Sequence, residues 1–274
     1  MIRVGATPVG LGFAVAIWLL GQFLGQLADP PAPDRPVEAD ALPRSADSAG
    51  SGGRIAQLAV DRGRRGDVTT GTVWHVGDRA WLSNRHVLER CATHELHTQT
   101  PAEVERLWAH PDADLAAVRT ASTEAAVGLA GRAPERGSRA YAIGYPQGEP
   151  GIAELSLRSE GRMQLTGALS SDEPFRYKVW SVRSLPDHVA TTQGLGGISG
   201  GTVINDNGEA IGTVFGGNNR RGTLFTIPYA EVRAAADALT EARLAGGPGA
   251  IDDPRDYAER VLASDRVARV LCRY

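Results

Sequence analysis

Three short segments of the chain carry residue types that could together break an acyl bond. His86 follows the apolar run 80–83, Asp114 comes directly before an apolar run, and Ser199 lies in the glycine-rich stretch 194–201. A serine hydroxyl is a weak nucleophile that needs a base, and the base needs an acid to fix its tautomer. Glycines around a serine permit a sharp turn that aims amide N–H groups at a developing oxyanion. The pattern predicts nucleophilic catalysis by serine, histidine and aspartate.

Each segment also has a simpler interpretation. A histidine after a strand is more often structural, and Asp112 competes with Asp114 for the acid role, although the register of the following strand favours Asp114. The glycine-rich stretch could be a linker or a phosphate-binding loop, but it lacks the Lys-Ser/Thr ending of a P-loop and no helix is expected after it. An α/β-hydrolase would require its serine at a strand-to-helix turn and the order Ser, Asp, His, and neither condition is met.

The composition favours a folded β-rich protein. Apolar residues make up 42% of the 274 residues, which excludes a mainly disordered chain, and the net charge of −3 argues against a nucleic-acid partner held by a broad positive field. Residues 55–229 contain short β-like runs separated by turn residues, and 231–244 are expected to be helical because they are alanine-rich and contain no glycine or proline. Strands are expected at 68–76, 80–83, 104–109, 115–119, 139–143, 177–182, 201–204 and 210–215. Many strands with one late helix indicate an all-β antiparallel fold.

The N-terminal region differs from the rest. Residues 9–27 are apolar apart from two glutamines, and this favours an uncleaved signal-anchor helix within 1–28, with a cleaved signal peptide as the alternative. Arg3 would hold the N-terminus in the cytoplasm. The protein is therefore expected to be exported, anchored in the inner membrane and facing the periplasm or the extracellular side, or secreted after cleavage. Residues 29–53 are rich in Pro, Ala, Asp, Ser and Gly and are expected to form a disordered tether.

The three motifs and their order resemble the trypsin-like serine peptidases, in particular the bacterial Do-like (HtrA) branch without its PDZ domain. Residues 82–87 (LSNRHV) resemble that branch's histidine motif, 114–118 (DLAAV) its aspartate motif, and 197–201 (GISGG) its serine motif. Residues 203–212, 139–148 and 226–228 also fit. The resemblance implies two six-stranded antiparallel β-barrels within a peptidase domain over 54–244. Residues 245–274 are then expected to be a tail that packs on this domain, helical over 254–271.

The resemblance also implies roles for individual residues. Ser199 would be the nucleophile, His86 the general base and then acid, and Asp114 the orienting carboxylate, while the N–H groups of Gly197 and Ser199 would form the oxyanion hole. Two further groups would contact a polypeptide substrate: Thr192 and Gln193 near the floor of the primary pocket, and the strand residues Val214, Phe215, Gly216 and Gly217. No acid lies near the floor, so we expect little preference for Arg or Lys and some for small apolar side chains. No metal or organic cofactor is required, and the only other expected partner is the membrane, through the N-terminal helix.

One departure from the family pattern bears on activity. Ile198 stands before the serine where the family has a polar residue, which in digestive enzymes is an acid that pairs with a newly cut N-terminus. Isoleucine cannot make that pair, so the oxyanion hole must be held open in another way. The same change leaves a second interpretation open, namely a catalytically inactive binding or scaffold protein of the cell envelope.

Two cysteines, Cys91 and Cys272, are too few for a disulfide scaffold. Cys91, His94 and His97 could ligate a metal, but their spacing does not match a structural zinc pattern. A disulfide between the two cysteines is better motivated, because an exported protein meets an oxidising compartment. Such a bond would pin the expected C-terminal helix beside the loop that carries His86.

Overall fold

The structure is a computed structural model that describes residues 39–42, 55–60, 63–89, 91–98, 102–121, 125–240 and 251–274. The expected signal-anchor helix over 1–28 lies outside these residues. Among the described residues, no helix combines the length and the apolar character that a bilayer crossing requires.

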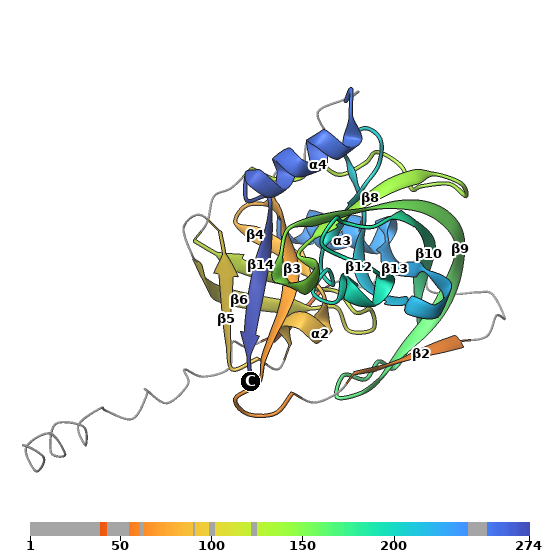
Figure 1. Ribbon diagram of the computed structural model, residues 1–274. Coiled ribbons are helices and arrows are strands. Elements are labelled where there is room, and N and C mark those ends of the chain that lie inside the picture. The colour runs from red at the N-terminus through yellow and green to blue at the C-terminus, as the bar shows by residue number, and fades with distance from the viewer. Residues whose placement is uncertain are drawn as a thin grey trace, which may run out of the picture. The chain divides into compact units, whose positions relative to one another are not determined.

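The described residues form a mostly β protein with two sheets (Figure 1). Strands of the first sheet pair in the order β1-β6-β5-β14-β3-β4-β7, and a further pairing of β6 with β7 closes six of them on themselves. These strands are β1 (Ala39–Ala41), β3 (Val68–Gly77), β4 (Ala80–Ser83), β5 (Thr93–His97), β6 (Ala102–Ala109), β7 (Ala116–Thr120) and β14 (Val267–Arg273).

Strands of the second sheet pair in the order β10-β13-β12-β11-β8-β9-β2, and a pairing of β9 with β10 again closes six strands. They are β2 (Ile55–Val60), β8 (Arg139–Gly144), β9 (Gly151–Gly167), β10 (Phe175–Ser184), β11 (Thr202–Ile204), β12 (Ala210–Asn218) and β13 (Thr223–Pro228). All eight strands expected from the sequence are present, with shifts of a few residues at their ends.

Each sheet has seven strands, one more than expected, because a short N-terminal strand joins each in parallel. β1 pairs with β6, and β2 pairs with β9. The expectation of disorder over 29–53 therefore fails at Ala39–Ala41. β5 pairs with β6 only at the start of β6, through Glu103 and Ala102. The end of β6 at Leu107–Ala109 therefore has no partner in β5. β1 covers this open edge, and Leu42 after it is buried and donates its N–H to the Ala109 carbonyl at 2.8 Å.

The C-terminal tail contains a helix and a strand instead of one helix to residue 271. α4 (Pro254–Ala263) ends before Asp265, which has a left-handed φ of 53°, and β14 follows. In β14 the alternate residues Ala268, Val270 and Cys272 are buried, a period of two that suits a strand. β14 lies between β3 and β5 and completes the closed set of six strands in the first sheet (Figure 1). The tail is thus part of the sheet that also carries the histidine segment.

The remaining helices are short. They are α2 (Arg85–Leu88), α3 (Tyr229–Leu239) and the 3-10 turns η1 (Pro146–Gly148), η2 (Thr192–Leu195) and η3 (Asn219–Arg221). α3 begins two residues earlier than expected, directly after Pro228, and its end at Leu239 is five residues short of the predicted one. Residues 241–250 lie outside the described part.

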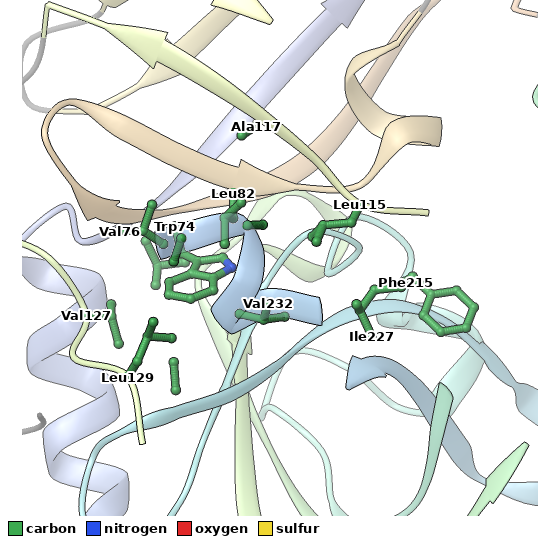
Figure 2. Close-up of a cluster of buried hydrophobic side chains, with 14 of the residues drawn as sticks. Trp74, Val76, Leu82, Leu115, Ala117, Val127, Leu129, Phe215, Ile227 and Val232 are labelled. Atoms are coloured by element: carbon green, nitrogen blue, oxygen red, sulfur yellow. The ribbon is translucent and has the colours of Figure 1, made fainter. Parts of the chain in front are cut away.

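A single buried cluster holds the two sheets together (Figure 2). It joins Trp74 and Leu82 of the first sheet to Phe215 and Ile227 of the second and to Val232 of α3. Burying each such side chain contributes roughly 1.5–3 kcal/mol. The Trp74 indole also donates to the Thr213 hydroxyl across the sheets at 3.1 Å. This shared core fixes the loops at the ends of β4 and β11 relative to each other, and these loops carry the histidine and the serine.

Candidate active site

His86 and Asp114 form a close pair. His86 lies in α2, directly after β4, and Asp114 comes just before β7, the neighbour of β4. The imidazole Nδ1 lies 2.6 Å from Asp114 Oδ2, and the His86 backbone N–H donates to Oδ1 at 3.0 Å. Asn84 adds a third bond, from its side-chain amide to the Asp114 carbonyl at 2.8 Å. An ionised carboxylate only accepts hydrogen bonds, so Nδ1 carries the proton and Nε2 of the neutral ring is left as a base.

The surroundings of His86 make it a stronger base than a free imidazole. Burial alone would lower the pKa of His86, but the charge of Asp114 and its hydrogen bond to the ring outweigh burial and raise the pKa above the ordinary value of 6.5. Asp114 is fully buried, whereas 25% of the His86 side chain remains exposed. The imidazole can therefore exchange a proton with a group in the adjoining cavity.

This pKa predicts the pH dependence of any hydrolysis that uses His86 as a base. The protonated ring cannot accept a proton from serine, so kcat/KM should fall as the pH is lowered through the raised pKa, with the midpoint of this acid limb above 6.5. Replacing Asp114 by asparagine removes the negative charge and should move the midpoint to lower pH. A profile of kcat/KM against pH for both proteins checks this, and a midpoint at or below 6.5 for the unmodified protein would contradict it.

Asp112, the other acid considered for this role, points elsewhere. Its carboxylate accepts the backbone N–H of Glu173 at 3.2 Å, and its own N–H donates to the His110 ring at 3.1 Å. Asp112 is buried and holds the 110–113 turn against the segment before β10. The geometry thus assigns the carboxylate beside His86 to Asp114.

The loop around Ser199 depends on two glycines with left-handed backbone angles. Gly197 has φ 96° and Gly200 has φ 87°. A Cβ on Gly200 would lie 1.9 Å from the Thr72 carbonyl and 2.1 Å from the Ser83 hydroxyl, so only glycine fits there. The Gly200 N–H donates to the Val214 carbonyl at 2.7 Å, which fastens the loop to β12.

The amides of Gly197 and Ser199 are left available by this loop. The Gly196 carbonyl accepts the Gln147 N–H at 2.6 Å, and the Ile198 carbonyl accepts the Gly201 N–H at 2.8 Å. Carbonyl and N–H point in opposite directions across a trans peptide, so the N–H groups of the following residues are turned away from these partners. Within the described part of the chain, the hydrogen-bond network gives neither N–H a protein acceptor. Two donors of this kind in one loop could stabilise an oxyanion.

Ile198 is buried with only 2% of its surface exposed. It packs in an apolar cluster with Leu195 and Val214, and a Cβ on Gly144 would lie 3.0 Å from its side chain. The residue before the serine is therefore anchored by apolar packing, where an acid would need a buried cation as a partner.

His86, Gly197 and Ser199 line one cavity of about 320 Å³. Eight further residues line it, mostly apolar and drawn from both ends of the described chain: Leu58, Ala59, Val60, Thr69, Thr70, Val87, Phe215 and Tyr274. Sequence reasoning found Phe215 but not the contributions of β2 and Tyr274. These two segments carry no motif, and only the parallel pairing of β2 and the insertion of β14 bring them to the site.

The expected substrate-binding residues fall into two groups. Thr192 and Gln193 lie in η2, where the Thr192 hydroxyl donates to the Asn219 carbonyl at 3.0 Å, and neither lines the cavity described above. In β12, the Val214 N–H and carbonyl both bond within the serine loop. Gly216 and Gly217 pair with β13 on one edge, and on their other edge no strand of the described residues pairs with them. That free edge could accept an extended peptide.

Cys91 and Cys272 form a disulfide, as predicted, with their Cα atoms 5.3 Å apart. The predicted partner element is wrong, because Cys272 lies at the end of strand β14 and not in a helix. Because Cys91 is bonded to Cys272, it has no free thiolate that could ligate a metal together with His94 and His97. His94 bonds to the Leu88 carbonyl through its Nε2. Across the described residues, no group of three or more His, Cys, Asp or Glu could hold a metal.

Comparison with known proteins places this geometry in a family. The trypsin-like peptidase domain matches residues 69–212, which is more than half of the chain and includes His86, Asp114 and Ser199. The chain belongs to the trypsin-like peptidase family. The family predicted from the three motifs is therefore confirmed, and membership indicates a peptidase. No curated protein sequence matches the chain.

Solved structures agree with this trypsin-like fold. The chain resembles the Rv3671c protease of M. tuberculosis in its active form, with a TM-score of 0.53 and 19% identity over 67% of this chain and 84% of that one. The inactive form of the Rv3671c protease matches with a TM-score of 0.51 and 18% identity, over 63% of this chain and 87% of that one. The HtrA-type protease AlgW with a decapeptide matches with a TM-score of 0.47 and 19% identity, over 63% of this chain and 52% of that one. The likeness to the Rv3671c protease shows the fold of this trypsin-like chain.

Proposed function

We propose that the protein is a serine endopeptidase that cleaves polypeptides outside the cytoplasm. One observation carries the proposal: His86, whose imidazole is held by Asp114, lines the same cavity as Gly197 and Ser199. Family membership supports peptide bonds as the target. The two closed sets of six strands would be the two barrels of the trypsin-like fold.

The reaction would proceed in two steps. His86 Nε2 takes the proton of the Ser199 hydroxyl as the oxygen bonds to the peptide carbonyl carbon, and the N–H groups of Gly197 and Ser199 receive the oxyanion. His86 then gives its proton to the leaving amine as the C–N bond breaks, which leaves an acyl-enzyme. Water, deprotonated by His86, attacks the acyl carbon, and the carboxylic acid leaves as Ser199 recovers its proton.

The shape of the site supports an extended substrate with apolar side chains. The free edge of β12 at Gly216 and Gly217 could add the substrate backbone as a further strand. Apolar groups from Leu58, Val87 and Phe215 line the cavity beside the catalytic pair. We therefore propose small or medium-sized apolar side chains near the scissile bond.

Two observations support action outside the cytoplasm. The Cys91–Cys272 disulfide is the kind of bond that persists in an oxidising compartment. The apolar N-terminal stretch of the sequence suits an export signal or an anchor in the inner membrane. We propose that the peptidase faces the periplasm or the extracellular side.

Labelling with a fluorophosphonate probe tests the proposed function. The serine oxygen displaces fluoride from phosphorus only when a base activates it, so the unmodified protein should carry one adduct, on Ser199. His86→Ala should abolish labelling, and His188→Ala is a matched control, since His188 bonds to the Pro146 carbonyl and does not line the cavity of Ser199. Mass spectrometry of the digested protein locates the adduct. A folded protein that stays unlabelled would instead favour the inactive binding or scaffold protein that Ile198 leaves open.

A further inference from the structure

Thr72 of β3 makes four hydrogen bonds at the junction of the two sheets. Its N–H donates to the Ser199 carbonyl at 2.8 Å, and its hydroxyl donates to the Gly197 carbonyl at 2.8 Å. The same hydroxyl accepts the Tyr145 N–H at 3.0 Å, and the Thr72 carbonyl accepts the Ser83 hydroxyl at 2.6 Å. Thr72 is fully buried. One residue of the histidine sheet thus holds the serine loop at both ends of the segment 197–199.

The bond to Gly197 matters because two successive glycines precede Ile198 in the loop. Gly196 and Gly197 have no Cβ, so no side chain of their own restricts their backbone angles. The hydroxyl of Thr72 gives its one hydrogen to the Gly197 carbonyl, and one of its two lone pairs accepts the Tyr145 N–H. The bond to Tyr145 orients the hydroxyl, and its bond to the Gly197 carbonyl acts together with the bond from the Ile198 N–H to the Leu195 carbonyl at 3.1 Å. These two bonds hold both sides of the peptide between Gly197 and Ile198.

The same bonds connect the nucleophile with the base. Ser83, which donates to the Thr72 carbonyl, ends the strand that leads into α2 and His86. Tyr145 follows β8 and precedes Gln147, whose N–H fixes the peptide of Gly196. Thr72 is therefore linked to every segment that shapes the pair of free amides, although it does not line the cavity.

We propose that Thr72 is a positioning residue that holds the oxyanion hole open, in the place of the charge pair that Ile198 cannot make. This inference rests on the proposed peptidase function. The backbone bond from its N–H could be made by any residue other than proline, but the bond to the Gly197 carbonyl needs a donor such as a hydroxyl at this position. The hydroxyl that valine would lack and serine would keep thus anchors the peptide between Gly197 and Ile198, which lies between the peptides that carry the Gly197 and Ser199 N–H groups.

Three variants test this role: Thr72→Val, Thr72→Ser and, as a matched control, Thr226→Val. Thr226 is also a fully buried threonine, and its hydroxyl accepts a bond from the Trp180 indole at 2.9 Å. The full loss of one oxyanion donor typically lowers kcat by about 100- to 1,000-fold. A misdirected donor should cost less, so we expect Thr72→Val to lower kcat by about 10- to 100-fold with KM changed by less than about twofold.

Serine restores the hydroxyl, so Thr72→Ser should recover kcat to within about threefold of the unmodified protein. Thr226→Val should lower the melting temperature and leave kcat unchanged. A peptide aldehyde, which forms a tetrahedral adduct with Ser199, should bind Thr72→Val more weakly by the same factor by which kcat falls. Unchanged kcat in a folded Thr72→Val protein, a rise in KM alone, or a loss that serine does not restore would each overturn the proposal.

If Thr72→Val does not fold, Thr72→Ala takes its place, and its kcat should lie about tenfold below that of Thr72→Ser. Equal values for alanine and serine would overturn the proposal. Failure of the proposed function has a different signature, since the unmodified protein would then neither hydrolyse peptides nor react with the fluorophosphonate.

Discussion

Replacing Asp114 by asparagine should lower kcat for peptide hydrolysis by about 10⁴-fold. The carboxylate accepts both the His86 ring N–H at 2.6 Å and the His86 backbone N–H at 3.0 Å. Asparagine can offer an N–H to the ring, which stabilises the tautomer with its proton on Nε2 and so blocks the base. It also removes the charge that stabilises the imidazolium formed during the reaction. The fold should persist, because the size and shape of the side chain hardly change.

Asp112→Asn is the matched control for this experiment. Asp112 lies two residues away and is also buried, and its bond to the Glu173 N–H needs only an oxygen acceptor, which asparagine keeps. Its kcat should stay within about twofold of the unmodified value. Steady-state hydrolysis of a fluorogenic peptide by the three proteins measures both effects. Equal losses for the two variants would mean that Asp114 acts through the fold and not through His86.

Removing the disulfide should destabilise the protein by about 5 kcal/mol. Cys91 and Cys272 are 181 residues apart in the sequence, and closing a loop of that length strongly restricts the unfolded chain. In the native state the bond fastens the end of β14 beside the start of β5, and β14 is the strand that closes the first sheet. The variant with both Cys91→Ser and Cys272→Ser should therefore unfold at a clearly lower denaturant concentration.

Denaturation in guanidinium chloride, followed by fluorescence, measures this change. Adding a thiol reductant to the unmodified protein should produce the same shift, and the double serine variant should not respond to the reductant. This comparison separates the loss of the covalent bond from the effect of the two new hydroxyls. Coincident transitions for the oxidised protein and the double variant would refute the prediction.

The candidate catalytic residues could be predicted from the sequence because they lie in local motifs. His86 follows a strand, Asp114 precedes one, and Ser199 is surrounded by glycines whose left-handed angles few other residues adopt. Each motif depends on a few neighbouring residues, so its meaning survives without knowledge of the rest of the fold. Eight of the fourteen strands in the described residues were predicted for the same reason, since alternating apolar residues and turn residues are local signals.

The C-terminal strand could not be distinguished from a helix in this way. The segment 264–271 is short, and its charged residues are mixed with apolar ones. Its periodicity therefore fits either a strand or a helix. This segment forms a strand because it lies between β3 and β5. There a strand pairs with the backbone N–H and C=O groups of both neighbours, which a helix would leave unpaired. The same principle placed β1 on the open edge of β6, inside a stretch with the composition of a tether.

By itself, the sequence indicated the family, the two-sheet architecture and the candidate base, acid and nucleophile. The tertiary structure added the contacts that set Asp114 beside His86 and Asp112 apart from it, the cavity walls supplied by β2 and Tyr274, and the bond from Thr72 to the Gly197 carbonyl. The physical reason is the range of the interactions. Turn geometry and strand alternation are set by residues adjacent in the chain, whereas the direction of a buried carbonyl depends on a hydroxyl 125 positions away.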